Sequence, residues 1–194
     1  GQIMPVSLAW ILALIARLLV TGCLHEDGLA DFFDGFGGGT TRERTLAIMK
    51  DSHIGSYGVI GLICYFLLLL QLHHLPLGLL CILVLCGDCW SKFCASQIVN
   101  YLPYARKEED SKSKTVYNRM SWHELLAGFL CGLLPFVLLL PIKLWIATLF
   151  PLLTFFLLYR LMKRRLQGYT GDCCGATFLL CELSFYLSLI HISE

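Results

Sequence analysis

Charged residues are scarce in this chain. Asp, Glu, Lys and Arg make up only 15% of its 194 residues, about ten percentage points fewer than in an ordinary soluble domain. The chain has no low-complexity linker, no internal repeat of solenoid type and no signal peptide with a small-residue cleavage site. Such a composition excludes a disordered chain and a coiled coil, and it argues against a soluble globular domain.

Hydrophobic residues are abundant instead, at 57% of the chain, with a mean hydropathy of +0.69. They gather in long runs, and a membrane-spanning helix needs about 20 apolar residues. Six runs meet that length: residues 3–24, 56–72, 77–102, 122–140, 142–162 and 171–192. We therefore expect an all-α, polytopic integral membrane protein of about six transmembrane helices, with residues 1–194 forming a single helical domain.

The ten cysteines do not change this expectation, because most of them lie inside the apolar runs, where cysteine behaves as a small hydrophobic residue. The spacing closest to that of a metal site is Cys86, Cys89 and Cys94, within one apolar segment. A structural zinc site needs a complete ligand set in a closed environment. We favour a packing role for these cysteines.

Three longer polar loops separate the apolar runs: residues 25–55, 103–121 and 160–170. Alternation of the six helices places all three loops on one side of the membrane, and they hold twelve of the 15 Lys and Arg residues. Basic residues concentrate in cytoplasmic loops, so we expect these long loops to face the cytoplasm. Within the first loop, residues 42–50 read as a short amphipathic helix.

The first loop begins with an acidic run that contains Asp27, Asp31 and Asp34. At 100° per residue these carboxylates span about 60° of a helix circumference, and like charges so close destabilise a helix. A bound cation removes that penalty, and Mg²⁺ held by carboxylates and substrate phosphates fits best. The alternative is an ordinary solvated helix end at the membrane surface.

A glycine-rich stretch follows the carboxylates, and Gly37 and Gly38 in it would let backbone amides approach an anion. It lacks the Gly-Lys-Ser/Thr ending, which excludes a Walker A motif. Farther along, Lys50 and His53 are candidates for contacting phosphate beside the carboxylates. Asp51 has two readings, a member of the acidic site or a cap of the following helix.

Several charged residues fall inside or at the end of apolar runs, and five of them bear on function. Asp172 opens the last run and Glu182 lies about three turns into it, and an acid within the membrane indicates a functional site. Asp88 and Lys92 form an i, i+4 pair that can neutralise itself. Arg17 lies about 10 Å from the cytoplasmic end of its helix, from where it can snorkel to the surface.

Several of these segments, in this order, resemble one enzyme family. They are LHEDGLADFFDG (residues 24–35), the glycines at 37–39, IMKDSHIG (residues 48–55), LPYAR (residues 102–106) and GDCCGA (residues 171–176). Together they resemble cobalamin synthase, the adenosylcobinamide-GDP ribazoletransferase family. The resemblance covers more than 150 residues and is much more specific than any one motif.

The resemblance implies the last assembly step of cobalamin synthesis, in a bacterial or archaeal cytoplasmic membrane with the active site facing the cytoplasm. The family joins adenosylcobinamide-GDP to α-ribazole, or to its 5′-phosphate, and releases GMP in a Mg²⁺-dependent reaction. The ribazole 3′-hydroxyl would attack the phosphorus that bears the aminopropanol arm. Membrane lipid is an expected partner and nucleic acid is not, while self-association or association with other cobalamin-assembly enzymes is left open. Because the family is usually longer, we expect this chain to lack an initial helix and a C-terminal tail.

Carried over by position, the resemblance assigns roles to individual residues. The expected metal ligands are Asp27, Asp31, Asp34, Asp172 and Glu182. The expected catalytic carboxylates are Asp31, Asp34 and Asp51. The expected substrate-binding residues are Lys50, His53, Lys92, Arg106, Gly37 and Gly38. The chain departs from the family pattern at Glu26, where an apolar residue is more usual, and at Lys92, where we expect Arg.

Two other functions compete with this one. A CDP-alcohol phosphotransferase also carries carboxylates at helical spacing, but Ala30 is followed here by Asp31 and not by the Arg of that family. A transporter would use Glu182, Asp88 and Lys92 as an ion path. Transporters usually place such residues at helix breaks in two related halves, whereas these acids gather at one interface and no two halves match.

Overall fold

The structure is a computed structural model that describes residues 3–106 and 118–193. Within these ranges it is helical, with a single isolated backbone bridge between Tyr104 and Tyr169. The helices are α1 (Val6–Thr21), α2 (Leu24–Gly38), α3 (Arg42–Lys50), α4 (Ser56–Leu70), η1 (Gln71–His74), α5 (Leu77–Ser96), α6 (Ile98–Tyr101), α7 (Trp122–Leu139), η3 (Ile142–Thr148), α8 (Leu149–Arg165) and α9 (Gly171–Ser193). The predicted all-α class is confirmed.

Five helical stretches are long and apolar enough to cross a membrane. They are Ser56–His74, Leu77–Tyr101, Trp122–Leu139, Ile142–Arg165 and Gly171–Ile190. The bent pair α1 and α2 makes a sixth if it is counted as one span. The expected polytopic membrane protein of about six helices is confirmed.

The first predicted span is wrong in one respect, because its helix ends three residues early, at Thr21. Gly22 and Cys23 both adopt the left-handed conformation, with φ of 61° and 57°, and two such residues in succession end a helix. The chain then starts α2 at an angle of 88° to α1. The acidic run therefore lies on a helix, as its spacing predicts, but on one that is separate from the first apolar run.

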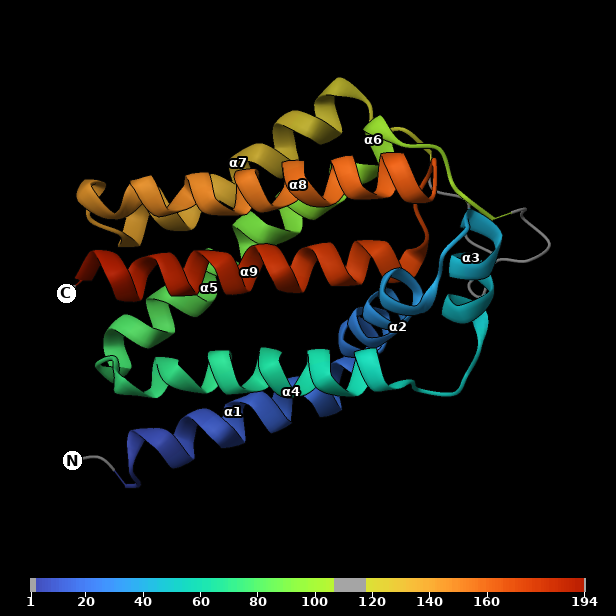
Figure 1. The fold of residues 1–194 in the computed structure, drawn as a ribbon. Helices are drawn as coiled ribbons and strands as arrows, with labels where there is room; N and C mark the ends of the chain where they lie inside the picture. The colour runs from blue at the N-terminus through green and yellow to red at the C-terminus, as the bar shows by residue number, and fades with distance from the viewer. Residues whose placement is uncertain (1–2, 107–117, 194) are drawn as a thin grey trace.

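Helix α9 occupies the centre of the bundle (Figure 1), where it packs against α2, α5 and α8. Of its most apolar 18-residue window, 72% is buried inside the protein, against 11% for α7 and 11% for the stretch Ile142–Arg165 formed by η3 and α8. A helix that is apolar on all sides is typical of such a central position. The outer helices instead expose large apolar side chains, as a lipid-facing surface requires.

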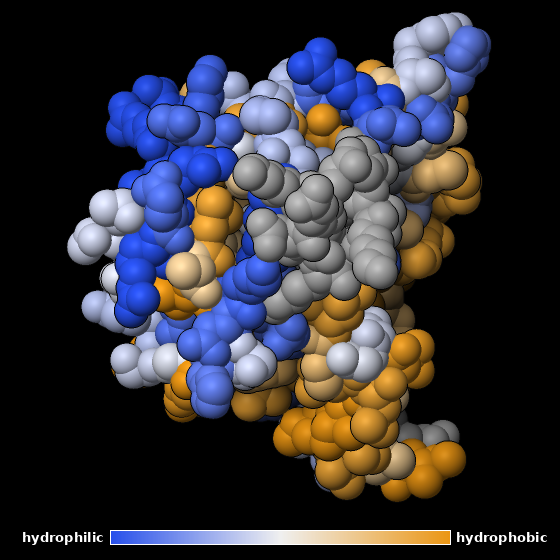
Figure 2. Space-filling model, turned by 90° about the vertical axis from the view of Figure 1, so that its right-hand side faces the viewer, coloured by the Kyte–Doolittle hydropathy of each residue, from blue (hydrophilic) through white to orange (hydrophobic). Residues whose placement is uncertain are grey.

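The described parts of the three predicted polar loops lie at one end of the bundle, which we call the polar end (Figure 1). Helices α2, α3 and α6 and the connection from α8 to α9 meet there, while both chain termini lie at the opposite end (Figure 1). Seen face on, the polar end is largely hydrophilic, with apolar residues along its flank (Figure 2). Residues 42–50 form a short helix, as predicted.

Candidate active site

Helices α2 and α9 cross with their backbones in contact. A Cβ atom added at Gly28 of α2 would lie 3.1 Å from the Cα of Asp172, and one added at Gly175 of α9 would lie 3.3 Å from the Cα of His25. Glycine at both positions therefore permits the close approach. Because Asp27 precedes Gly28, the crossing brings Asp27 and Asp172 to the same region from segments about 145 positions apart in the chain.

The loops of the polar end are joined beside this crossing. The Ala105 amide donates to the Tyr169 carbonyl (2.8 Å), and the Tyr169 amide donates to the Pro103 carbonyl (3.0 Å). Arg42, at the start of α3, donates to the carbonyls of Leu166 and Ala105, both at 2.7 Å. These bonds connect all three polar segments and place Arg106 next to the start of α9.

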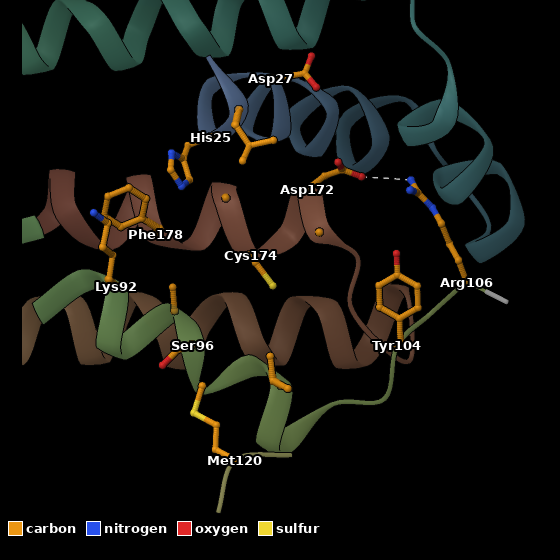
Figure 3. A pocket seen from close by; sticks show the side chains of 15 residues that line it. His25, Asp27, Lys92, Ser96, Tyr104, Arg106, Met120, Asp172, Cys174 and Phe178 are labelled. Carbon is orange, nitrogen blue, oxygen red and sulfur yellow. Dashed lines mark hydrogen bonds and ion pairs between the residues drawn. The ribbon is translucent and has the colours of Figure 1, made fainter. Parts of the chain in front are cut away.

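A cavity of about 450 Å³ opens at the crossing, and we call it the α2–α9 cavity. Its lining includes two carboxylates, two cations and one imidazole (Figure 3): Asp27, Asp172, Lys92, Arg106 and His25. The rest of the wall is mainly apolar. A mostly apolar pocket with a few convergent polar groups is the usual form of a small-molecule site.

Arg106 and Asp172 form a buried ion pair on this wall, with Nη2 and Oδ2 3.1 Å apart and only 5% and 12% of the side chains exposed. The Thr170 hydroxyl donates to the same Asp172 oxygen at 3.2 Å. The Nε of Arg106 is buried and has no hydrogen-bond partner among residues 3–106 and 118–193. An unpaired buried donor is unfavourable, so this arginine has bonding capacity left for a ligand.

Lys92 and His25 lie at the other side of the cavity, around Phe178 (Figure 3). The Nζ of Lys92 is 2.8 Å from Asp88, confirming the predicted i, i+4 pair, and 5.2 Å from the centre of the Phe178 ring. The His25 ring meets the Phe178 ring edge to face at 4.9 Å. A cation over an aromatic ring is stabilised there.

Asp34 does not reach this cavity. Its carboxylate accepts the backbone amides of Gly55 (2.7 Å) and Gly58 (2.8 Å), which belong to the N-terminal end of α4. Carboxylates favour that position because the first amides of a helix are unpaired and the helix dipole is positive there. Both oxygens of Asp34 are thus engaged in joining α2 to α4.

Asp51 and His53 lie with Asp34 and Gly38 in a separate groove of about 520 Å³ between α3 and α4. The backbone amide and Nδ1 of His53 lie 3.0 Å and 2.7 Å from Asp51 Oδ1. These hydrogen bonds lower the pKa of the Asp51 carboxyl below its ordinary value. Asp51 follows the last residue of α3, and no cap of α4 by its side chain is found.

The remaining predicted residues of the first loop are spread along α2 and α3. Asp31 is half-buried between Asp27 and Asp34 on the same face of α2, and Lys50 is the exposed last residue of α3. Gly37 lies under the Tyr57 ring, where a Cβ would come within 2.5 Å of the ring. Neither Gly37 nor Gly38 lines the α2–α9 cavity.

Glu182 is fully buried away from the cavity, about 15 Å along α9 from Asp172 at 1.5 Å per residue. Its carboxylate pairs with Arg17 of α1, at 2.9 Å, and accepts the Tyr186 hydroxyl at 2.8 Å. The expectation that Arg17 snorkels to the surface is therefore wrong, because a buried carboxylate is available to it. Glu182 is not placed with the other predicted metal ligands.

No three His, Cys, Asp or Glu side chains within residues 3–106 and 118–193 are grouped so that they could hold a metal ion. The α2–α9 cavity holds two carboxylates, Asp27 and Asp172. Mg²⁺ is commonly bound by one or two carboxylates together with substrate phosphates and water. The oxygen donors of this cavity therefore fit Mg²⁺ in the presence of a phosphate substrate, but not a closed site made by protein alone.

Comparison with known proteins shows the family of the chain. A family model described as cobalamin-5-phosphate synthase matches residues 1–190. The chain belongs to this family. No solved structure matches it.

Three relatives in the cobalamin-5-phosphate synthase family are named adenosylcobinamide-GDP ribazoletransferase. The one from Shewanella amazonensis is 43% identical, with 97% of this chain and 74% of the relative aligned. The one from Shewanella woodyi is 40% identical, over 98% and 76% of the two chains. The one from Vibrio parahaemolyticus is 39% identical, over 97% and 72%.

Sequence reasoning missed several residues of the cavity of this cobalamin-5-phosphate synthase homologue. Phe178 and Cys174 line it from α9, and Tyr104 from the loop before Arg106. Phe178 was detectable, because it follows Gly171 and Gly175 at i+7 and i+3 and so lies on the same helix face. Ser96 and Met120 carry no such signal, since they reach the cavity only through tertiary packing.

Proposed function

We propose that this chain transfers the phosphorylated corrinoid of adenosylcobinamide-GDP to α-ribazole, or to α-ribazole 5′-phosphate, and releases GMP. One observation carries the proposal. The α2–α9 cavity gathers Asp27, Lys92, Arg106 and Asp172 from separate polar and helical segments, in a chain of a family whose relatives are named for this transfer. The two cations and two carboxylates are the groups that phosphoryl transfer requires.

Arg106 and Lys92 would bind the diphosphate. Arg106 is nearly buried and has an unpaired Nε, and guanidinium donors match phosphate oxygens well. Lys92 Nζ contributes a second positive charge on the opposite wall. Charge that develops on the phosphate oxygens in the transition state would be stabilised most strongly in such a partly enclosed site.

Asp27 and Asp172 would hold Mg²⁺ together with the substrate phosphates. When bound, Mg²⁺ supplies neutralisation of the phosphate charge. The structure supports this assignment through the shared location of the two carboxylates and through the exposure of Asp27 to the cavity. The metal requirement itself is part of the proposal.

Asp31 is our candidate for the general base. The 3′-hydroxyl of α-ribazole would attack the phosphorus that bears the aminopropanol arm, its proton would pass to a carboxylate, and the bond to GMP would break. Asp31 is preferred for its position, one turn from Asp27 on the same face of α2 at a rise of about 6 Å, while Asp34 and Asp51 line the separate groove between α3 and α4. The base role requires Asp31 to come within hydrogen-bonding distance of the hydroxyl.

The apolar wall of the cavity suits the base of α-ribazole. Phe178, Val99, Ala95 and Leu24 form much of it, and an aromatic heterocycle buries its surface favourably against such groups. A volume of about 450 Å³ is in the range of a pocket for a small organic ligand. The much larger corrin ring would extend from the cavity at the polar end.

We also propose that the polar end faces the cytoplasm of a bacterium or archaeon, in the cytoplasmic membrane. The concentration of Lys and Arg in its three segments supports this orientation. Contact with membrane lipid, and association with itself or with other cobalamin-assembly enzymes, belong to the same proposal. Nucleic acid is not an expected partner.

The decisive experiment measures GMP release by the purified chain in liposomes with adenosylcobinamide-GDP, α-ribazole and Mg²⁺. We expect GMP and a cobalamin product in equal amounts, and loss of both with EDTA that excess Mg²⁺ restores. CMP release from a CDP-alcohol instead would favour the phospholipid-synthesis alternative. Product formation unaffected by EDTA would contradict the metal assignment alone.

Variants locate the site in the same assay. Asp27→Asn and Asp31→Asn each remove a charge with little change of volume. For Asp31→Asn we expect a loss of turnover of at least about 100-fold, the usual range for a general base, and for Asp27→Asn a clear loss of turnover together with a higher Mg²⁺ requirement. Glu43→Gln is the matched control, because Glu43 is an exposed carboxylate of α3 outside the cavity. Normal turnover in Asp27→Asn would overturn the location of the site.

A further inference from the structure

The C-terminal end of α8 carries a basic and aromatic groove on the outer surface of the bundle. The groove measures about 410 Å³ and is lined by Phe156, Tyr159, Arg160, Lys163 and Arg164. Counted from Phe156, the other four follow at three, four, seven and eight positions, so all five lie on one side of the helix. The groove is separate from the α2–α9 cavity and shares no residue with it.

The cations of this groove rest on its aromatic rings. The Arg160 guanidinium carbon lies 5.4 Å from the centre of the Phe156 ring, and Lys163 Nζ lies 5.5 Å from that of Tyr159. Lys163 also donates to the Tyr159 hydroxyl at 3.2 Å. These contacts orient two positive charges without neutralising them.

Arg160, Lys163 and Arg164 form no ion pair with a carboxylate in the described part of the chain. Their neighbours differ: Arg165 donates to the carbonyls of Phe36 and Gly39, and Arg106 pairs with Asp172. Arg165 and Arg106 thus make contacts within the polar end that Arg160, Lys163 and Arg164 do not make. With respect to the carboxylates of residues 3–106 and 118–193, the groove is left with three cations available to an external anion.

An apolar surface continues from the groove along α8. Leu149, Leu152, Leu153 and Leu157 are between 41% and 57% exposed, and Phe156, at 48%, joins this surface to the cations. An amphiphile with an anionic head and an acyl chain would match both parts. Free phosphate would satisfy the cations only.

We propose that the α8 groove binds the headgroup of an anionic phospholipid, with an acyl chain lying along the exposed apolar face of α8. Basic pockets at the membrane interface are known to bind such headgroups. In this arrangement the Tyr159 ring would lie at the headgroup level, where Tyr is favoured. The site would fix the depth of α8, and hence of the polar end, relative to the bilayer surface.

The test measures binding of phosphatidylglycerol and of phosphatidylcholine with identical acyl chains to the full chain in detergent, by native mass spectrometry. Each basic residue near an anionic surface contributes about 1 kcal/mol, or fivefold. We therefore expect the triple variant Arg160→Gln, Lys163→Gln, Arg164→Gln to bind phosphatidylglycerol at least tenfold more weakly. Lys143→Gln is the control, because Lys143 is an exposed lysine in η3 at the opposite end, and it should change binding less than twofold.

Three results would overturn the proposal: unchanged phosphatidylglycerol binding in the triple variant, an equal loss in Lys143→Gln, or equal binding of phosphatidylcholine by the wild-type chain. Displacement of the lipid by millimolar inorganic phosphate would assign the groove to a free anion and would also contradict it. If the triple variant fails to fold, a measurement on the wild-type chain alone still tests the proposal. Raising the ionic strength tenfold should weaken binding of phosphatidylglycerol and not that of phosphatidylcholine, and equal effects on both would contradict the proposal.

Discussion

Two arginines of this protein pair with carboxylates of the same helix, α9, but in different surroundings. Arg106 meets Asp172 on the wall of a cavity, whereas Arg17 meets Glu182 deep among the apolar helices. A buried pair without access to a ligand has a structural role, and breaking it leaves an uncompensated charge. The two pairs should therefore respond to substitution in opposite ways.

At Arg106, activity should fall while stability changes little. Arg106→Lys keeps the charge but replaces the planar fork by a single ammonium group. A lost charge-assisted hydrogen bond corresponds to about 1.5–3 kcal/mol, so we expect kcat/KM for adenosylcobinamide-GDP to fall about 10- to 100-fold in the GMP-release assay. Arg119→Lys, at an exposed position, is the control. Unaltered kinetics in Arg106→Lys would exclude a phosphate-binding role.

At Arg17, stability should fall first. Arg17→Met leaves Glu182 buried and unpaired, which we expect to destabilise the protein by about 3–5 kcal/mol in thermal unfolding in detergent. The double variant Arg17→Met, Glu182→Leu should recover most of this loss, because a buried ion pair replaced by apolar residues is often neutral. A double variant as unstable as the single one, or a selective loss of Mg²⁺ affinity in Glu182→Gln, would restore Glu182 as a metal ligand.

The sequence could predict part of this pattern. Asp27, Asp172, Lys92 and Arg106 were all singled out, and the structure brings them to one cavity. Arg17 and Glu182 were noted separately, yet their pairing spans 165 positions and no local spacing indicates it. Roles that depend on a distant partner stay hidden until the helices are packed.

Among the helices, α2 shows how one face can serve two sites. Its three aspartates share a face, as their spacing predicts, but Asp27 and Asp34 are about 10 Å apart along the axis at 1.5 Å per residue. Different neighbours meet the two ends of that face: α9 contacts Gly28, and α4 contacts Asp34. Periodicity specifies the direction of a side chain and not the element that it meets, which is why the single predicted cluster is divided.

The α2–α4 junction should behave as a helix cap. Asp34→Asn weakens the hydrogen bonds that the Gly55 and Gly58 amides donate to this side chain. We expect the free energy of unfolding to fall by about 1–2 kcal/mol and the Mg²⁺ dependence of activity to stay unchanged. Gly58→Ala should cost about 1–3 kcal/mol, because its Cβ would come within 2.4 Å of the Asp34 carboxylate. Gly78→Ala, on α5 with open space around it, is the matched control. A changed Mg²⁺ requirement in Asp34→Asn would return Asp34 to the metal site.

The helices themselves were the most predictable level. Long apolar runs and the amphipathic pattern of residues 42–50 are local signals, and each produced a helical segment, although the first run ends its helix at Thr21 and the run from Ile142 begins with the 3-10 helix η3. The break after Thr21 was not predicted, because only Gly22 gave a turn signal and Cys23 rarely adopts a positive φ. The 88° change of direction there is a consequence of packing.

For the whole molecule, the gathering of polar segments at one end makes the orientation testable. Ser52 is exposed at the polar end and Gln71 at the opposite one. In intact cells, a membrane-impermeant maleimide should label Gln71→Cys above the wild-type background and should label Ser52→Cys only after lysis. The reverse pattern would overturn the cytoplasmic orientation.

Arg42 holds two polar segments to the start of α3 through the Leu166 and Ala105 carbonyls. Because one guanidinium bonds both segments, displacement of Arg42 removes a hydrogen bond from each of them at once. Such sharing makes local unfolding cooperative. The amides of Ala105 and Tyr169 should then exchange with deuterium at one common rate, so that the polar end opens and closes as a single unit.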